Sequence, residues 1–213
     1  MKGELRVVED VPATFADLVG HARPASVALS GGATARRCYE HLAAVPDLDW
    51  TRTEVLFGDE RWVPVTHEES NEGMARRVLL ERVPVAAIHS MRRAGPTIAE
   101  AAEAYDRLVA DLGGIDLIHL GLGPDGHTAS LFPGSAALDA TDRYVVQTAH
   151  TDWQRLTFTY AAIAQGRLVV VTVAGSGKHD ALRRVREGDP SVPASRIAAE
   201  SVVWLVDPSA AGG

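Results

Sequence analysis

The chain of 213 residues is 46% hydrophobic and 23% charged, values that are ordinary for a soluble globular protein. A net charge of −7, without a basic stripe that carries interleaved aromatic residues, argues against nucleic acid as a partner. No apolar run approaches the ~20 residues of a membrane span, and a charged N-terminus with a single cysteine, Cys38, predicts a cytoplasmic protein without an internal disulfide.

Segments typical of strands and of helices alternate along the chain. Apolar, β-branched runs predict strands at residues 4–8, 26–30, 53–58, 115–123, 144–149, 156–160, 167–175 and 201–206. Helical periodicity predicts helices at residues 33–43, 71–83, 97–112 and 178–188. Thr97 and Glu100 form a predicted capping box for the third helix, and Gly113 ends it. We expect the tail, residues 207–213, to fray.

Most of the predicted strands are apolar along their whole length rather than at alternate residues. This pattern indicates burial on both faces, as in a parallel sheet that helices cover. It predicts one α/β layered domain over residues 1–213. Ligands of such sheets bind beyond the carboxyl ends of the strands, where the strand order reverses. Functional residues are therefore expected in the loops that follow strands.

The loop at residues 30–34 reads Ser-Gly-Gly-Ala-Thr and leads into a predicted helix. Two glycines let backbone N–H groups turn toward one point, and the helix start adds partial positive charge, so phosphate is a suitable ligand. The hydroxyls of Ser30 and Thr34 can donate further hydrogen bonds to it. A tight turn with Thr34 as an ordinary N-cap explains the same residues equally well.

Charged residues follow the third predicted strand in the segment Gly-Asp-Glu-Arg, residues 58–61. Side chains alternate along an extended backbone, so at most two of Asp59, Glu60 and Arg61 can point into one site. Considered alone, the segment is more typical of a solvated charged turn.

Residues 121–134, Gly-Leu-Gly-Pro-Asp-Gly-His-Thr-Ala-Ser-Leu-Phe-Pro-Gly, surround one histidine with four glycines and two prolines. Imidazole accepts a proton near neutral pH, and the nearby Asp125 can fix the tautomer of His127 or stabilise its charged form. A glycine loses more conformational freedom on folding than any other residue, which costs roughly 1 kcal/mol of stability in a regular element. A loop this rich in glycine therefore distinguishes His127 from the other seven histidines. The segment is not a dinucleotide-binding fingerprint, because the third glycine at the required spacing is missing.

The segment Gly-Ser-Gly-Lys, residues 175–178, ends a strongly β-branched strand and places Lys178 at the start of a helix. Thr172 and His179 depart from the Walker pattern, which argues against a nucleotide triphosphatase. A flexible ammonium suited to one phosphate remains. Lys178 is one of only two lysines in a chain with 19 arginines.

Arg155, Thr157 and Thr159 occupy alternate positions of an extended segment, so their side chains are expected on one face. A surface ion pair is the simpler explanation of Arg155. No His, Cys, Asp and Glu set has the spacing of a metal site, and the Gly-x-Ser-x-Gly motif of serine hydrolases does not occur. We therefore expect neither a metal nor a serine nucleophile.

Taken in chain order, the segments LSGGAT, LFGDERWVP, SNEGMARRVLL, LIHLGLGPDGHTASLFPG, RLTFTY and VAGSGK resemble the 6-phosphogluconolactonase family. The resemblance spans residues 26–185, and the segment around Asp125 and His127 is its most specific part. It implies a three-layer α/β/α, modified Rossmann-like fold with a mainly parallel sheet, as in glucosamine-6-phosphate isomerase-like proteins.

The resemblance also implies an activity, the hydrolysis of 6-phospho-D-glucono-1,5-lactone to 6-phospho-D-gluconate in the oxidative pentose phosphate pathway, without a cofactor. It implies that His127 is the general base that activates water and that Asp125 supports it. Backbone N–H groups near Gly31, Gly32 or Gly123 are candidate oxyanion donors. The residues implied to hold the phosphate and sugar oxygens are Ser30, Gly31, Gly32, Thr34, Asp59, Arg61, Arg155 and Lys178.

Two other functions stay open. A glucosamine-6-phosphate deaminase is expected to carry an acid soon after the Asp-Gly-His segment, and residues 128–133 contain none. A non-catalytic sugar-phosphate-binding module needs no imidazole base and usually carries a DNA-binding segment, which this chain lacks. The partner in the favoured reading is a small phosphorylated sugar lactone, and both a monomer and a dimer are compatible with it.

Overall fold

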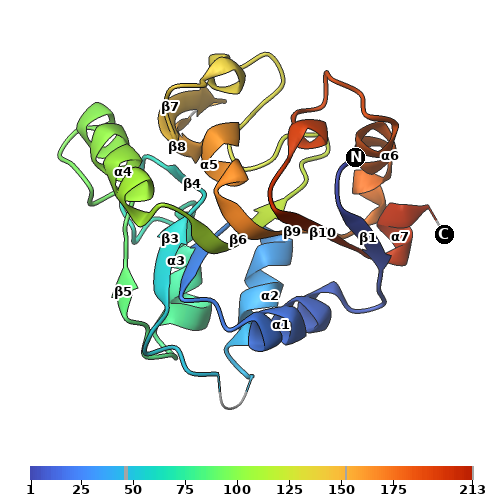
Figure 1. Cartoon of the computed structure of the whole chain (residues 1–213), viewed down its shortest axis with the longest axis horizontal. Coiled ribbons are helices and arrows are strands. Elements are labelled where there is room, and N and C mark those ends of the chain that lie inside the picture. The colour runs from blue at the N-terminus through green and yellow to red at the C-terminus, as the bar shows by residue number, and fades with distance from the viewer. Residues whose placement is uncertain (46–47, 152, 213) are drawn as a thin grey trace.

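The apolar strands form a parallel sheet at the centre of the molecule (Figure 1). The computed structural model describes residues 1–45, 48–151 and 153–212, and within them seven strands pair in the order β1-β10-β9-β6-β2-β3-β5. Their bounds are β1 (Glu4–Val7), β2 (Ser26–Leu29), β3 (Glu54–Phe57), β5 (Ala87–Ile88), β6 (Ile115–Gly121), β9 (Gly166–Val173) and β10 (Ser201–Val206). Strand order reverses between β2 and β6, because β3 and β5 extend the sheet on one side of β2, whereas β6, β9, β10 and finally β1 extend it on the other.

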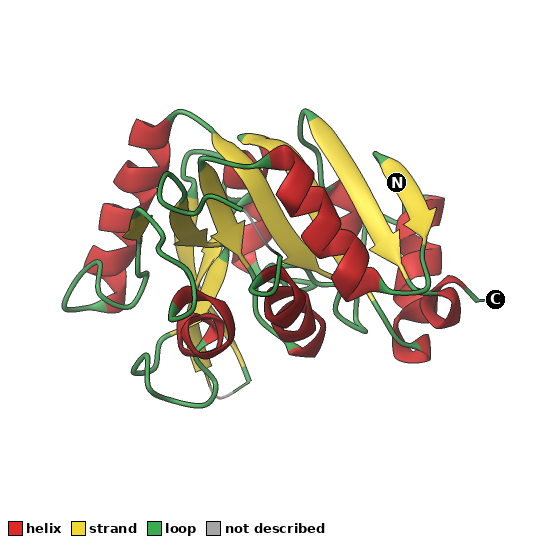
Figure 2. Cartoon of the chain, turned by 90° about the horizontal axis from the view of Figure 1, so that it is seen from below, coloured by secondary structure: helices red, strands yellow, loops and turns green. Residues whose placement is uncertain are grey.

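Helices cover the sheet, as the continuous apolar strands require. The helices are α1 (Val11–Ala22), α2 (Ala33–Leu42), α3 (Asn71–Ala75), α4 (Ile98–Leu112), α5 (Tyr160–Ala164), α6 (His179–Glu187) and α7 (Pro208–Ala211). In Figure 1, α1 and α2 lie on one side of the strands β6 and β9, and α5 lies on the other. Seen from below in Figure 2, helices lie across the twisted strands. The predicted α/β class is confirmed.

Helix α4 begins and ends as its capping residues predict, whereas the helix predicted at residues 71–83 differs from the prediction. Thr97 and Glu100 form both bonds of the capping box, and Gly113 ends α4 in the left-handed conformation at φ 64°. The predicted helix at 71–83 is divided, because α3 passes into a π-helical segment, Arg76–Leu80.

A second, antiparallel sheet was not predicted. In the described residues it contains β4 (Asp59–Arg61), β8 (Trp153–Phe158) and β7 (Val145–His150), in the order β4-β8-β7. The charged strand β4 carries no apolar pattern of its own and exists because it pairs with β8. Thr159 lies immediately beyond the end of β8, and its side chain caps α5 by accepting from the N–H of Ala162.

The expectation of a frayed tail is also wrong for residues 207–212. Asp207 accepts a hydrogen bond from the N–H of Ala210 at 2.7 Å and caps α7. Its second carboxylate oxygen accepts from the N–H of Gly175 at 2.8 Å. Ala210 is fully buried, so the tail is held by both capping and packing. Gly213 lies outside the described residues.

None of the helices formed by the described residues has both the length and the apolar character that crossing a membrane requires.

Candidate active site

A cavity of about 340 Å³ lies at the carboxyl ends of β2, β6 and β9, beside the point where strand order reverses. This volume is within the range of roughly 300–1,000 Å³ that is typical of small-molecule sites. The predicted residues that line the cavity are Ser30, Gly31, Gly32, Thr34, Asp59, Arg61, His127, Arg155 and Lys178. Asp125 is not among the lining residues, but it is hydrogen-bonded to His127, which is. The structure therefore brings together residues that are up to 148 positions apart, counted from Ser30 to Lys178.

Asp125 and His127 form a hydrogen-bonded pair at the cavity. Oδ1 of Asp125 lies 2.5 Å from Nδ1 of His127 and also accepts from the His127 backbone N–H at 3.2 Å. Burial acts to raise the pKa of Asp125, but the backbone and imidazole of His127 outweigh it, and the pKa is lowered overall. An ionised carboxylate can only accept, so Nδ1 of His127 donates in this hydrogen bond and Nε2 is the ring nitrogen left to act as a base.

Glycine is required at two positions of this loop. A Cβ at Gly123 would overlap Nδ1 of His127, and it would lie 2.7 Å from Oδ1 of Asp125. Gly126 has φ 88°, and a Cβ there would overlap the side chain of Val192. The N–H of Gly123 donates to the carbonyl of His127 at 2.8 Å, so the expectation that it serves as an oxyanion donor is wrong.

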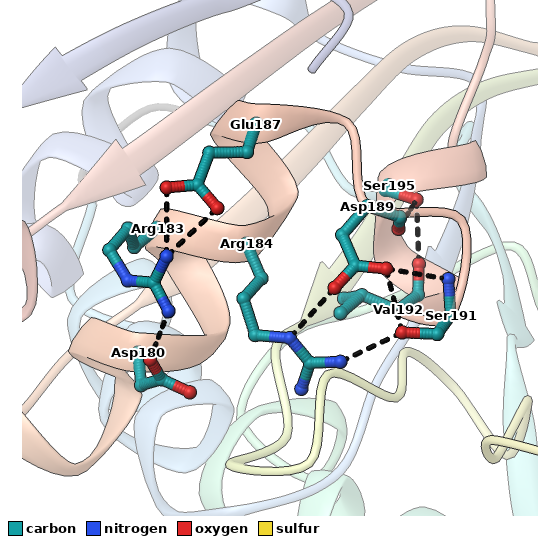
Figure 3. A network of polar contacts seen from close by, with 8 residues as sticks. All are labelled: Asp180, Arg183, Arg184, Glu187, Asp189, Ser191, Val192 and Ser195. Carbon is teal, nitrogen blue, oxygen red and sulfur yellow. Dashed lines mark hydrogen bonds and ion pairs between the residues drawn. The ribbon is translucent and has the colours of Figure 1, made fainter.

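The turn at residues 189–196 contacts the loop that carries His127. The N–H of Ala194 donates to the carbonyl of Gly126 at 3.0 Å. Figure 3 shows how this turn is fixed to α6: Asp189 accepts from Ser191 and from Arg184, and Arg184 also donates to Ser191. The donors of Ser191, followed by Arg184, lower the pKa of Asp189 to about 2, so the network stays charged at neutral pH.

The residues that follow His127 are fixed to the antiparallel sheet. Ser130 is fully buried, and its hydroxyl donates to Oδ2 of Asp59 at 2.6 Å. Its backbone N–H donates to Oγ1 of Thr157 at 3.1 Å. Ala129, which lies between His127 and Ser130 in the sequence, adopts the left-handed conformation at φ 48°, which is unusual for a residue other than glycine. Such strain occurs often at functional sites, where the surrounding structure enforces it.

Arg61 and Arg155 lie directly opposite each other in the pairing of β4 with β8. Like charges at directly opposed positions of a sheet destabilise it unless an anion or acid compensates them. Burial, followed by the charge of Arg61, lowers the pKa of Arg155. Arg155 is 8% exposed, so the alternative of a surface ion pair is wrong. Two neighbouring guanidinium groups in a cavity wall are suited to an anionic ligand.

Alternation along β4 separates its charged side chains as predicted. Asp59 and Arg61 line the cavity, whereas Glu60 points away and accepts hydrogen bonds from the start of α3. Asp59 and Glu60 are 5% and 2% exposed, so this segment is not a solvated turn. Burial raises the pKa of Glu60 to about 7, although its backbone and hydroxyl donors oppose this.

The diglycine loop forms another part of the cavity wall. Gly32, at φ 96°, is the N-cap of α2 and makes no side-chain capping bond. Thr34 lies inside the helix and lines the cavity, so the simpler explanation of Thr34 as an N-cap is wrong. The loop is held by Tyr39, whose hydroxyl accepts from the N–H of Ser30 at 2.7 Å and lies 2.9 Å from Nδ1 of His119.

Lys178 ends a short 3-10 turn and immediately precedes α6. Its side chain reaches the cavity that His127 also lines. Burial lowers the pKa of Lys178, and the nearby carboxylate of Asp125 opposes this shift. A nearby anionic ligand would stabilise the charged form of this partly buried ammonium and offset the cost of its burial.

Asn71 and Thr172 are polar cavity residues that were not among the predicted site residues, and Asn71 is the more buried of the two. It is 2% exposed and lies at the first position of α3, where Ser70 caps the helix by accepting from the N–H of Gly73 at 2.9 Å. The Ser-Asn pair before the helical pattern marked a helix start, but nothing in the local sequence connected it with Arg61. In the described residues, no group of three or more His, Cys, Asp or Glu side chains is placed to hold a metal ion.

A family model, a relative in sequence and a solved structure all indicate the same protein family for this chain. A family model described as "Glucosamine-6-phosphate isomerases/6-phosphogluconolactonase" matches residues 4–204. A 6-phosphogluconolactonase of Synechocystis sp. is 41% identical over 199 residues, which cover 87% of this chain and 82% of that protein. The crystal structure of 6-phosphogluconolactonase from Thermotoga maritima aligns over 97% of this chain and 100% of its own, with a TM-score of 0.86 and 28% identity.

A monomeric glucosamine-6-phosphate deaminase has the same fold, with a TM-score of 0.89 over 98% of this chain and 99% of its own, but only 17% identity. That likeness shows the fold alone. The family model and the Synechocystis relative together show that this chain belongs to the glucosamine-6-phosphate isomerase/6-phosphogluconolactonase family.

Proposed function

We propose that this protein hydrolyses 6-phospho-D-glucono-1,5-lactone to 6-phospho-D-gluconate in the oxidative pentose phosphate pathway. The observation that carries the proposal is the pairing of His127 with Asp125 in the wall of a cavity that Arg61, Arg155 and Lys178 also line. This arrangement joins a base to an anion-binding surface. The relatives that are 33–41% identical are named for this reaction.

In the proposed reaction His127 acts first as a base and then as an acid. Nε2 of His127 takes a proton from water as the water oxygen attacks the C1 carbonyl of the lactone. The tetrahedral intermediate then collapses, the bond from C1 to the ring oxygen breaks, and the imidazolium returns a proton to that oxygen. The acid formed at C1 ionises to the carboxylate of the product. Asp125 holds Nδ1 and stabilises the imidazolium.

The opposite end of the substrate is assigned to the cations. Arg61, Arg155, Lys178 and the residues Ser30, Gly31, Gly32 and Thr34 bind the phosphate and sugar oxygens, and Asp59 accepts from a sugar hydroxyl. The paired arginines of β4 and β8 support this assignment, because an anion offsets their mutual repulsion.

The proposal includes the organisation and location of the chain. We treat residues 1–213 as one 6-phosphogluconolactonase-like domain, which is supported by the single connected cluster of buried hydrophobic residues in the described part of the chain. A cytoplasmic location is supported by the unpaired, buried Cys38.

A direct assay tests the function and separates it from its alternatives. Purified protein is incubated with freshly prepared 6-phosphogluconolactone and, separately, with glucosamine-6-phosphate. We expect acid release from the lactone well above an enzyme-free control, which is needed because the lactone also opens spontaneously, and no ammonia from the amino sugar. Ammonia release would favour the deaminase, and binding of 6-phosphogluconate without any turnover would favour the sugar-phosphate-binding module.

Replacing Lys178 by alanine should raise KM for the phosphorylated lactone about tenfold or more, with a smaller change in kcat. The physical reason is the loss of a charge-assisted hydrogen bond to the phosphate, which acts in the ground state and the transition state alike. Steady-state kinetics measure both constants. Lys2→Ala is the matched control, because Lys2 is the other lysine and is exposed. A fall in kcat with unchanged KM would contradict the assigned role.

A further inference from the structure

Asn71 lies where three parts of the proposed site meet. Its amide Nδ2 donates to the main-chain carbonyl of Asp59 at 2.9 Å and to Oδ1 of the same residue at 3.1 Å. Its Oδ1 accepts from Nη1 of Arg61 at 2.5 Å. One side chain therefore contacts both polar residues that β4 directs into the cavity.

The position of Asn71 is itself fixed from the far side of β4. Its backbone N–H donates to Oε1 of Glu60 at 2.8 Å, and Oε2 of Glu60 accepts from Ser70 and from the N–H of Glu72, each at 2.8 Å. Glu60 thereby joins the first turn of α3 to the strand that carries Asp59 and Arg61. The amide of Asn71 is thus preorganised rather than mobile.

The same amide determines how closely the diglycine loop can approach. A Cβ at Gly31 would overlap Oδ1 of Asn71 and lie 2.9 Å from Nδ2. The loop proposed to bind phosphate therefore passes in direct contact with the group that holds Arg61. Gly31 is required here by this contact and not by its backbone angles, since it is not among the residues with positive φ.

The absence of charge on the Asn71 side chain determines its effect on Arg61. A carboxylate in its place could also bond Arg61, but it would neutralise the guanidinium and repel Asp59. The amide orients Arg61 and leaves its positive charge available to an anion. Nε of Arg61 is buried and has no hydrogen-bond partner in the described residues, and its Nη2 lies 3.7 Å from the half-exposed Glu69.

We propose that Asn71 is a positioning residue for the phosphorylated substrate, which orients Arg61 and Asp59 through hydrogen bonds without neutralising the charge of Arg61. This inference rests on the proposed function, because it assigns Arg61 to substrate binding. It places Asn71 outside the chemical step, so its effect belongs mainly to KM.

Three variants test the role. Asn71→Ala should raise KM for the lactone, and the inhibition constant of the product 6-phosphogluconate, by about tenfold, while kcat changes less than threefold. Asn71→Asp keeps the size and the acceptor but adds a negative charge. It should raise KM and the inhibition constant further than Asn71→Ala does. Asn71→Ser, which keeps a small neutral polar group, should fall between Asn71→Ala and the wild type.

A double variant separates positioning from packing. Gly31→Ala alone should lower the melting temperature, because its methyl group overlaps the amide of Asn71. Adding Asn71→Ala should restore the melting temperature but leave KM at the raised value of the single Asn71 variant. A double variant with wild-type KM would overturn the proposal, since packing would then explain the whole effect, and so would an Asn71→Asp variant that binds as tightly as the wild type.

The failure of the proposed function would appear separately, as absence of lactone turnover by the wild-type protein. The affinity for inorganic phosphate, measured by its protection against thermal unfolding, still ranks the same variants in that case. We expect wild type to bind most tightly, then Asn71→Ala, then Asn71→Asp. Equal protection of all three would overturn the positioning role independently of turnover.

Discussion

Replacing His127 by asparagine should lower kcat for lactone hydrolysis by on the order of 10²–10⁴-fold and change KM little. Asparagine can still donate an N–H to Oδ1 of Asp125, so the loop keeps its hydrogen bond while the basic Nε2 is lost. The residues proposed to bind phosphate lie on other loops, so we expect the substitution to leave them in place. Initial rates corrected for spontaneous opening of the lactone measure both constants.

The control for this variant is His41→Asn. His41 is an exposed histidine of α2, and the one hydrogen bond of its ring to the described residues is with the carbonyl of Arg37 in the same helix. We expect wild-type kinetics from it. Turnover by His127→Asn at the rate of the control would remove His127 from its proposed role. A large rise in KM with unchanged kcat would assign the imidazole to binding instead of proton transfer.

Replacing Gly123 by alanine should lower kcat by about 10²-fold or more, although Gly123 carries no functional group. The added Cβ would overlap Nδ1 of His127 and crowd Oδ1 of Asp125, so the imidazole must turn away from its productive position. A displacement of about 1 Å is enough for a loss of this size. The variant should fold, because the φ angle of Gly123 is not positive.

Gly121→Ala is the matched control for Gly123→Ala. Both glycines line the same cavity from the same segment, but a Cβ at Gly121 would meet no atom within 4 Å. We expect Gly121→Ala to retain kcat within a few-fold of the wild type, with the same melting temperature. Equal losses in the two variants would show that the added volume in the cavity, and not displacement of the His127–Asp125 pair, is responsible.

Much of the architecture follows from local patterns. The continuous apolar strands, such as 167–175, predict a buried parallel sheet, and the Thr97 and Glu100 capping box predicts where α4 begins. The carboxyl ends of such strands lie at one edge, so the loops at 30–34, 121–127 and 175–178 could be assigned to a common site. These signals are readable because strand burial and helix capping act between residues near in sequence.

The sequence by itself therefore determined the α/β class and predicted the loops that line the cavity, and its loop pattern led us to propose His127 from among eight histidines. Only the tertiary structure decided which charged groups meet. The register of β4 on β8 places Arg61 opposite Arg155, and the turn into α3 brings Asn71 onto Arg61. Such contacts join segments that are 10 to 94 positions apart, and their geometry depends on strand register and on helix placement, which no local pattern of side chains specifies.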